Sequence, residues 1–253
     1  MRSKDRRALL LEALTAGEEI DVEDLATRFE VSASTIRRDL QQLSSSEGIK
    51  RTYGGAILVH PAGETSLSQR QASNRTQKAA IARAACSLLA QDDILILDGG
   101  STVAAFGHLL RNRRHRVITN NLALVSPLAE AAEIELTVLG GAVRPTSMST
   151  VGPLAMEAMR RMTADKVFLG ADGVVAGRGL CEASLDQIAL KTLMMDQARE
   201  VFVLADATKL SRTNQAMWAP LPARWTLITD WSASLEQCDL FAAAGARVIR
   251  ASQ

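Results

Sequence analysis

The chain has 253 residues, which at roughly 100 to 200 residues per domain corresponds to one large domain or two smaller ones. Hydrophobic residues make up 47% and charged residues 23% of the sequence, so wholesale disorder and collagen-like order are excluded. The formal net charge is +1, and the protein as a whole therefore has no pull toward nucleic acid or a membrane surface. Any site for a polyanion must be a local patch.

Few residues in the chain suit metal or redox chemistry. The three cysteines stand far apart, and neither their odd number nor their spacing suits a disulfide framework or a zinc site. Glu12 interrupts the first apolar run before it reaches the length of a signal peptide, and no stretch approaches the ~18 apolar residues of a membrane helix. With three histidines there is almost no material for a histidine-based site. We expect a cytoplasmic protein with no membrane partner, no metal and no cofactor.

Residues 1 to about 57 show the pattern of three short helices followed by a hairpin. Leucines recur at helical spacing near the start, a second helix is predicted over 22–29, and Ser32 is suited to cap a third helix that runs to about residue 44. Two extended segments within 47–56, bounded by glycines, predict a β-hairpin. This order of elements predicts a winged helix-turn-helix domain that binds DNA.

The third helix would carry long hydrogen-bond donors on one exposed face, because its apolar residues fall on the opposite stripe. In a winged helix-turn-helix, this helix enters the major groove with its N-terminal residues on base edges. The wing would add two cationic side chains at an exposed turn. The candidate DNA-binding residues are Ser34, Thr35, Arg37, Arg38 and Gln41 on the helix and Lys50 and Arg51 in the wing.

The charge of this segment argues against DNA binding. Residues 1–60 contain nine Lys and Arg against ten Asp and Glu, a net charge of −1, whereas DNA-binding domains are usually basic. Seven of the ten acidic residues fall between Glu12 and Glu30, however, and the candidate DNA-binding residues lie beyond them. The alternative interpretation is that Arg37 and Arg38 belong to a solvated charged face.

The rest of the chain shows a different pattern. Residues 58–75 are polar and contain Pro61 and Gly63, which indicates a linker. Helical periodicity resumes over 76–90, and short continuous apolar runs then alternate with helical stretches, which is typical of buried parallel strands with right-handed crossovers. The predicted strands are 94–97, 117–119, 134–139, 167–169, 201–205, 225–229 and 248–249, and the stretches 148–152 and 173–179 are candidates for an antiparallel excursion.

We therefore predict a DNA-binding domain of residues 1–57, a linker of residues 58–75 and a mostly parallel α/β domain of residues 76–253.

Polar residues and glycines follow the predicted strands at the edge where open α/β sheets bind ligands. Asp98-Gly-Gly-Ser-Thr102 is suited to a phosphate, because glycines let the backbone approach and a helix start presents free N–H groups. It matches neither the Rossmann nor the P-loop pattern, so a plain strand-to-helix turn is the alternative. Asp98 is better suited to sugar hydroxyls, and Lys209 would supply positive charge. The candidate binding residues are Asp98, Gly99, Gly100, Ser101, Thr102, Asn120, Asn121, Gly141, Asp172, Asp206 and Lys209.

Motifs from both parts of the chain occur in one collinear order. Thr35-Ile-Arg-Arg-Asp-Leu40 and Arg51-Thr-Tyr-Gly-Gly-Ala56 closely resemble the winged helix-turn-helix of the DeoR family of bacterial transcriptional regulators of sugar catabolism. The resemblance continues through Asp98-Gly-Gly-Ser-Thr102, Thr119-Asn-Asn121, Leu139-Gly-Gly141, Val151-Gly-Pro153, Phe168-Leu-Gly-Ala-Asp-Gly173, Gly179-Leu180 and Leu204-Ala-Asp-Ala-Thr-Lys209.

This resemblance implies a C-terminal sensor domain similar to the ribose-5-phosphate isomerase and CoA transferase folds, with a phosphorylated sugar or related metabolite as effector. It also adds Lys191 to the candidate effector-binding residues. The chain departs from the family pattern in two places. Cys181-Glu182-Ala183 stands where small hydroxyl residues are usual, and Ala189 stands where Glu is frequent two positions before Lys191. The identity of the effector stays open.

We expect a transcriptional regulator, in the first place a repressor of a sugar or polyol catabolic operon that a phosphorylated sugar releases from double-stranded operator DNA. One winged module buries only ~600 to 1,000 Å² of protein surface, so a homodimer or homotetramer is expected. An activator with the same architecture is one alternative.

The other alternative is an isomerase-like enzyme acting on sugar phosphates, since Asp98, Asp172, Asp206, Lys191 and Lys209 are plausible acid and base groups. Such an enzyme has no need of the first 57 residues, and Ala183 and Ala189 weaken a catalytic constellation. We therefore predict a protein that is not an enzyme.

Overall fold

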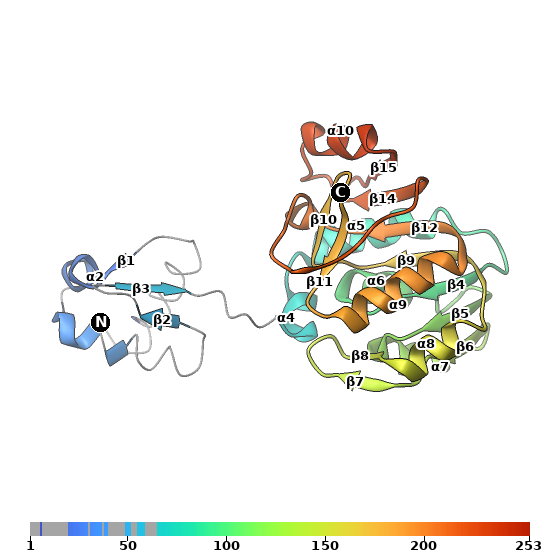
Figure 1. Ribbon diagram of the computed structural model, residues 1–253, viewed down its shortest axis with the longest axis horizontal. Helices are drawn as coiled ribbons and strands as arrows, with labels where there is room; N and C mark the ends of the chain where they lie inside the picture. The colour runs from blue at the N-terminus through green and yellow to red at the C-terminus, as the bar shows by residue number, and fades with distance from the viewer. Residues whose placement is uncertain are drawn as a thin grey trace. The chain divides into compact units, whose positions relative to one another are not determined.

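The structure is a computed structural model of the whole chain and describes residues 6, 20–29, 31–36, 38–39, 49–51, 55–58 and 65–253. The chain divides into two compact units, residues 1–64 and residues 65–253 (Figure 1). Among the described residues, no helix combines the length and the apolar character that crossing a membrane requires.

In the first unit, the described residues form a helix and a small antiparallel sheet. Helix α2 spans Val22–Arg28, and strands β1 (Ile20–Asp21), β2 (Ile49–Arg51) and β3 (Gly55–Leu58) pair in the order β1-β3-β2. β2 and β3 are antiparallel neighbours, as the predicted wing requires. Lys50 and Arg51, which we expected at a turn, lie within β2 because the first strand of the hairpin extends through them.

The third predicted helix is described at its start, over residues 33–36 and 38–39. The hydroxyl oxygen of Ser32 accepts a hydrogen bond from the backbone N–H of Thr35 at 3.3 Å, which is the predicted capping contact. Ile36 is fully buried, whereas Arg38 is exposed. The apolar stripe and the polar face of this helix therefore point in different directions, as the periodicity indicates.

A buried ion pair joins two distant parts of the first unit. Nε of Arg6 donates to a carboxylate oxygen of Asp39 at 2.6 Å, and both residues are almost completely buried. Because a buried charge is costly without a partner, this pair fixes the position of residue 6 against the third helix.

A seven-stranded parallel sheet forms the centre of the second unit, with the strand order β15-β14-β12-β9-β4-β5-β6 (Figure 1). Each of the seven apolar runs that predicted a buried strand falls on one of these strands, although 134–139 and 201–205 extend one residue beyond the strand's end, so the predicted parallel α/β fold is confirmed. The strands are β4 (Ile94–Leu97), β5 (His115–Thr119), β6 (Ile134–Val138), β9 (Ala164–Leu169), β12 (Ala198–Leu204), β14 (Trp225–Thr229) and β15 (Ala246–Arg250).

Helices cover both faces of this sheet, because alternate residues of each strand pack on opposite sides. In β9, Val167 and Leu169 belong to one core and Phe168 to the other. The Phe168 ring lies 4.4 Å from that of Phe106 and 4.9 Å from that of Phe202, measured between centroids. The helices on the Phe168 side are α5 (Arg75–Cys86), α6 (Ser101–Gly107) and α7 (Val125–Ala129), and those on the other side are α8 (Pro153–Met159), α9 (Leu185–Asp196) and α10 (Leu235–Ala243).

Short antiparallel pairs extend the loops beyond the sheet. β7 (Ala142–Arg144) pairs with β8 (Ser149–Val151), while β10 (Gly173–Val175), β11 (Gly179–Glu182) and β13 (Met217–Ala219) form a separate sheet. The stretches 148–152 and 173–179 thus enter two antiparallel sheets rather than one. The three residues of β13 are too few to give a periodic signal in the sequence. Three 3-10 turns, η1 (His108–Leu110), η2 (Leu122–Leu124) and η3 (Ala207–Lys209), complete the described elements.

Residues 65–75, which the sequence places in the linker, lie in the second unit. Helix α4 spans Leu67–Ala72 and begins with a capping box, in which Ser66 and Gln69 each bond the other's backbone. Leu67 is buried, and its N–H donates to the carbonyl oxygen of Thr146 at 2.8 Å. Because this stretch is polar, the sequence was interpreted as a linker and the helix was missed. The spacing of Ser66 and Gln69 is nevertheless the pattern of a helix start.

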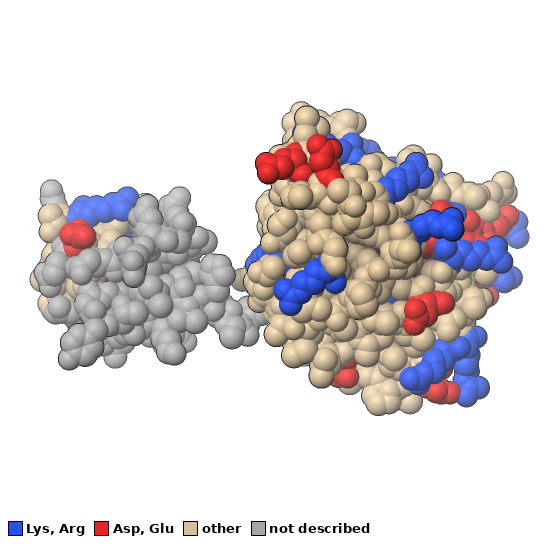
Figure 2. All heavy atoms as spheres, turned by 45° about the horizontal axis from the view of Figure 1, so that its top comes forward, with Lys and Arg blue, Asp and Glu red and all other residues tan. Residues whose placement is uncertain are grey.

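Charged side chains of the second unit are intermixed on the face shown in Figure 2, where Lys and Arg lie singly or beside Asp and Glu. In the arginine-rich stretch 111–116, basic side chains also lie beside acidic ones. Its ion pairs are Arg111 with Glu130, Arg114 with Asp92 and Arg116 with Glu135, at 3.7, 3.2 and 2.9 Å. Three of the four arginines in this stretch thus have an acidic partner.

Replacing Phe168 by Ala should destabilise the second unit by about 3 to 5 kcal/mol, because the ring fills the space between two other rings in a closed core. All three tryptophans of the chain lie in this unit, so urea unfolding followed by tryptophan fluorescence reports on it. Leu154→Ala is the control, because Leu154 is 71% exposed and its loss should change stability by less than about 0.5 kcal/mol. Equal stabilities of the two variants would contradict this account of the core.

Candidate functional site

The strand order of the central sheet reverses between β4 and β9. From β4 the chain moves outward through β5 to β6, returns to the other side of β4 as β9, and then moves outward again through β12 and β14 to β15. Ligands of open α/β sheets bind beyond the carboxyl ends of the strands at such a reversal. The loops that leave β4 and β9 meet there, since the Asp98 carboxylate accepts a hydrogen bond from the N–H of Gly170 at 3.1 Å.

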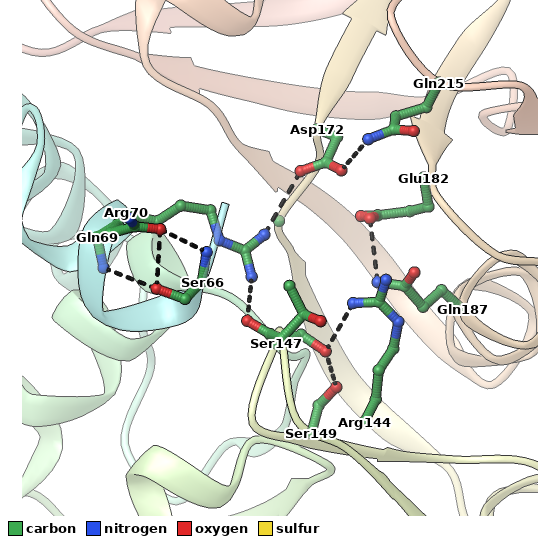
Figure 3. Close-up of polar contacts among 12 residues, drawn as sticks. Ser66, Gln69, Arg70, Arg144, Ser147, Ser149, Asp172, Glu182, Gln187 and Gln215 are labelled. Atoms are coloured by element: carbon green, nitrogen blue, oxygen red, sulfur yellow. Dashed lines mark hydrogen bonds and ion pairs between the residues drawn. The ribbon is translucent and has the colours of Figure 1, made fainter. Parts of the chain in front are cut away.

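A cavity of about 200 Å³ lies at this reversal. Its walls come from the loops after β4, β9 and β12, from the turn between β7 and β8, from β11 and α9, and from the connection between α4 and α5. Figure 3 shows side chains from several of these segments pointing toward one another. Charged side chains of both signs line the cavity: the cations are Arg70, Lys78, Lys209 and Arg212, and the carboxylates are Asp172, Glu182 and Asp206.

The loop after β4 leaves backbone donors free at one wall. Gly100 has a φ of +141°, a conformation that residues with a side chain rarely adopt. It is the N-cap of α6, and no side chain caps the helix there, so the first-turn N–H groups stay available to a ligand. Ser101 and Thr102 line the cavity beside them. This wall can hold an anion such as a phosphate.

Two buried asparagines lie behind that loop. The side-chain amide of Asn121 donates to the backbone oxygens of Asp98 at 3.1 Å and Gly100 at 3.2 Å, while Asn120 donates to the backbone oxygen of Thr150 at 3.0 Å. Neither asparagine lines the cavity. Asn121 therefore holds the loop after β4 in place, while Asn120 bonds β8.

Gly141 also lies outside the cavity lining. Its φ is +134°, and a Cβ at this position would be 2.5 Å from the backbone oxygen of Val151. Backbone conformation and close packing therefore account for the glycine.

A buried cluster of ions adjoins the cavity. The Lys191 ammonium contacts the Asp98 carboxylate, an oxygen of Glu182 at 3.0 Å and the backbone oxygen of Gly170 at 2.9 Å. An ammonium has three hydrogens, so these acceptors use all of them. Burial by itself would lower the pKa of Lys191, but the carboxylates of Asp98 and Glu182 outweigh burial and raise that pKa. Lys191 is therefore a charged residue that holds the loops behind the cavity together.

Glu182 brings a buried carboxylate to the cavity wall. One carboxylate oxygen contacts Lys191, and the other accepts a hydrogen bond from the side-chain amide of Gln187 at 3.2 Å (Figure 3). Burial raises the pKa of Glu182 to about 7; Lys191 opposes the rise, while Asp172 and Asp98 add to it. The sequence singled out Glu182 only as a departure from the family pattern. Ala189, the other departure, is exposed on α9 and does not line the cavity.

Arg70 closes the cavity on the side of α4. Its guanidinium donates to the Asp172 carboxylate at 3.4 Å and to the backbone oxygen of Thr146 at 3.3 Å (Figure 3). Asp172 also accepts a hydrogen bond from the side-chain amide of Gln215 at 2.9 Å. These contacts connect α4 to the loops after β9 and β12.

Two further lining residues are Asn74, in the connection between α4 and α5, and Lys78, near the start of α5. Asn74 donates to the Asp206 carboxylate at 3.2 Å. The Lys78 ammonium donates to the backbone oxygens of Arg70 and Ser73, at the end of α4. Sequence reasoning missed Arg70, Asn74 and Lys78 as binding residues because no predicted strand precedes them. Lys78 lies in the helix predicted over 76–90, whereas only the capping box before α4 indicates structure around Arg70.

Two lysines on the cavity wall, the buried Lys78 and the half-buried Lys209, are short of hydration. Burial lowers the pKa of Lys78 and of Lys209, and the nearby carboxylates of Asp206 and Asp172 oppose this change. An anionic ligand would replace the lost hydration and stabilise both charged forms.

The structure brings together most of the residues that the sequence proposed for ligand binding. Asp98 and Lys191 form the ion pair behind the wall, while Asn120, Asn121 and Gly141 lie farther out. The predicted residues that line the cavity are Gly99, Gly100, Ser101, Thr102, Asp172, Asp206 and Lys209.

The predicted DNA-binding residues belong to the first unit. Ser34, Thr35 and Arg38 lie on the described part of the third helix, and Lys50 and Arg51 lie in β2. Ser34 and Arg38 are exposed, as contacts with DNA require. Arg37 and Gln41 lie outside the described residues.

Comparison with known proteins agrees with both units. The family model described as "DeoR C terminal sensor domain" matches residues 73–231, and that described as "DeoR-like helix-turn-helix domain" matches residues 6–62. The chain is similar to the HTH-type transcriptional repressor GlcR of Bacillus subtilis (strain 168), with 32% identity over 255 residues, 100% of this chain and 98% of the relative. It is 29% identical to the transcriptional repressor AccR of Agrobacterium fabrum over 231 residues, 90% of each chain.

A solved structure of ribose 5-phosphate isomerase A from Methanocaldococcus jannaschii matches 55% of each chain with 22% identity and a TM-score of 0.40, a likeness too weak to bear on function. The two family models and the relatives confirm the resemblance noted in the sequence motifs. With a helix-turn-helix domain followed by a sensor domain, this chain belongs to the DeoR family.

Proposed function

We propose that this protein is a transcriptional repressor of a sugar or polyol catabolic operon, and that a phosphorylated sugar or related metabolite releases it from operator DNA in the cytoplasm. The observation that carries the proposal is the cavity at the sheet reversal, which combines a wall suited to a phosphate with carboxylates suited to hydroxyl groups. The relatives compared above are themselves named as repressors, which supports the direction of regulation.

In this proposal the cationic and the anionic lining residues bind different parts of the effector. The Gly99–Thr102 backbone, Lys78 and Lys209 receive the phosphate, because its negative charge replaces the hydration that the two lysines lack. The carboxylates would repel a phosphate and instead accept hydrogen bonds from the sugar. Asp98 and Lys191 act through the position of Glu182 and of the two loops, since Lys191 has no donor left.

DNA recognition is assigned to the first unit. We infer that Ser34, Thr35, Arg37, Arg38 and Gln41 contact base edges and phosphates in the major groove and that Lys50 and Arg51 contact the backbone from the wing. The intermixed charges of the second unit give operator DNA no comparable surface on the face seen in Figure 2. A homodimer or homotetramer would supply two or more such heads for a symmetric operator.

The connection between the proposed DNA-binding domain of residues 1–57 and the sensor domain of residues 76–253 takes part in sensing. Arg70 and Asn74 lie within residues 58–75, yet both line the cavity. An effector phosphate would compete with the end of α4 for the Lys78 ammonium. A ligand that binds two arrangements of this segment with different affinity shifts their populations, and a coupling of ~1 to 3 kcal/mol changes operator affinity ~5- to 150-fold.

An isomerase-like enzyme fits the same cavity less well. The lysine nearest to the carboxylate cluster, Lys191, spends its three hydrogens on Asp98, Glu182 and Gly170, so it has no proton positioned for a substrate. The presence of a helix-turn-helix domain in the same chain also favours a regulator.

Replacing both Arg37 and Arg38 by Ala should weaken specific operator binding, by ~1 to 3 kcal/mol for each side chain that reads a guanine. The operator is first selected with the wild-type protein from a pool of random duplexes, and gel-shift titrations then compare the two proteins. Arg199→Ala is the control, because this arginine belongs to the second unit and its side chain is 84% exposed. Unchanged binding by a folded double variant would contradict the assignment.

Replacing Lys209 by Ala should leave operator affinity unchanged and remove most of the effector affinity, because the lysine lies at the proposed phosphate position. A panel of sugar phosphates is first screened by thermal stabilisation, since a ligand at 100 times its dissociation constant adds ~2.7 kcal/mol. Gel shifts with increasing effector then compare Lys209→Ala with wild type and with Arg199→Ala. Release of DNA at the same effector concentration in all three proteins would exclude Lys209 from the sensor.

The phosphate assignment has a separate test in calorimetry on a sugar phosphate and its dephosphorylated sugar. We expect the sugar to bind far more weakly, because it has no group for Lys78, Lys209 and the glycine loop. Equal affinities for the pair would overturn the assignment.

A further inference from the structure

The carboxylate end of the cavity carries one negative charge in excess. Asp98 and Glu182 share a single ammonium, that of Lys191, and all three residues are buried. Asp172, the next carboxylate, already has the guanidinium of Arg70 as its own partner. With Glu182 ionised, the cluster of two carboxylates and one lysine therefore has a net charge of −1 in a place that water hardly reaches.

Glu182 is the member of this cluster that can meet a ligand. It lines the cavity, whereas Asp98 and Lys191 lie behind it. Lys191 and Gln187 each fill one hydrogen-bonding position, one on each carboxylate oxygen. An ionised carboxylate has about four such positions, so about two stay open to a ligand.

The position of this carboxylate is fixed in advance of binding. Glu182 ends β11, which pairs with β10 on one side and β13 on the other. Gln187 is itself held by Ser184, whose hydroxyl donates to the amide oxygen at 3.2 Å. A ligand group placed opposite Glu182 would meet a rigid acceptor, which favours selectivity.

The charge of the whole cavity points to the same kind of ligand. Its lining has four cationic and three anionic side chains, a net charge of +1, and the Asp98–Lys191 pair behind it adds nothing. A phosphate dianion would turn this into −1. A ligand that carries a phosphate at one end and an ammonium at the other would leave the filled cavity neutral, with each charge facing its opposite.

We propose that the effector of this protein is a phosphorylated amino sugar, and that Glu182 selects it by accepting hydrogen bonds from the ligand's ammonium group. This inference rests on the proposed function, because it assigns the phosphate of the same ligand to Lys78, Lys209 and the glycine loop. An equivalent hydroxyl would donate a hydrogen bond but leave the excess charge at Asp98 and Glu182 in place.

The protonation behaviour of Glu182 supports this inference. Four groups face its carboxyl: Lys191 and Gln187 from α9, Asp98 after β4 and Asp172 after β9. Burial raises the pKa of Glu182 to about 7, so near neutral pH the site gains a proton when nothing else offsets the charge. A ligand ammonium lowers this pKa and keeps Glu182 ionised, whereas a neutral sugar with a phosphate dianion raises it and causes proton uptake.

The test uses the full-length protein and two matched pairs of ligands, glucosamine 6-phosphate with glucose 6-phosphate and galactosamine 6-phosphate with galactose 6-phosphate, plus inorganic phosphate. Calorimetry should show that the amino member of at least one pair binds about 10- to 100-fold more tightly, the range for one charge-assisted hydrogen bond. Glu182→Gln should remove that preference, while inorganic phosphate should bind at least as tightly as it does to the wild-type protein, because the substitution removes a negative charge from the cavity wall. Asp186→Asn is the matched control, because Asp186 is an exposed carboxylate at the start of α9 that does not line the cavity.

A second measurement is made first on the wild-type protein. Titrations at pH 7.0 in two buffers of different ionisation enthalpy give the protons exchanged on binding, and the hydroxyl member of a pair should take up more than the amino member. The difference should vanish in Glu182→Gln.

The possible failures are distinguishable. Equal affinities within each pair, or a preference that survives in Glu182→Gln, would overturn the inference and leave Glu182 as a structural partner of Lys191. If glucose or galactose 6-phosphate also releases operator DNA, the proposed function stands without the amino group. If none of the four phosphorylated ligands binds, this inference falls, whereas the proposed function falls only if no member of the wider panel of sugar phosphates stabilises the protein.

Discussion

The Lys191 ammonium is the contact on which the geometry of the site depends. It lies on α9 and reaches the loop after β4 through Asp98, the loop after β9 through Gly170, and the end of β11 through Glu182. Because the lysine is 2% exposed, any partner that moved away would leave a buried charge with an unmet donor. The two loops at the sheet reversal and the antiparallel sheet above them are thereby held at one point, and the cavity wall is rigid on this side.

The opposite wall is built from different contacts. Arg70 reaches the cavity from α4, Asn74 from the connection after it and Lys78 from α5. Their partners are the carboxylates of Asp172 and Asp206 and backbone oxygens. A charged ligand offers alternative partners to each of these three side chains. The wall around Lys191 thus has a fixed shape that a ligand must match. The wall of Arg70, Asn74 and Lys78 can change its contacts when a ligand binds. The second wall begins at the residues that follow the first unit.

What the sequence predicted depended on how local its signals were. The strands of a parallel sheet are buried on both faces, so each is a continuous apolar run such as 94–97 and is visible without knowledge of its neighbours. The loop residues that follow those strands, such as Ser101 and Asp172, were placed by topology alone, because parallel strands end at the same edge. For these parts, sequence and structure agree.

The residues that sequence reasoning missed owe their place to contacts between distant segments. Arg70 belongs to a helix of six residues whose burial depends on Leu67 and on the backbone of Thr146, far along the chain. Glu182 reaches the cavity because β11 pairs with β13, and three residues of β13 give no recognisable period. Charge pairing across such distances has no signature in a single sequence. This is why the glycine loop after β4 was predictable and the carboxylate end of the cavity was not.

The buried pair of Arg6 and Asp39 has a consequence for how the protein is handled. Asp39 follows Arg38 on the DNA-reading helix, and a bare carboxylate beside that face would repel the phosphates of DNA. Arg6 cancels this charge from the extreme N-terminus. A shortened start, an affinity tag or a proteolytic cut that disturbs residue 6 would therefore weaken DNA binding while every DNA-contacting residue is still in place, and such a preparation could be mistaken for a protein that does not bind its operator.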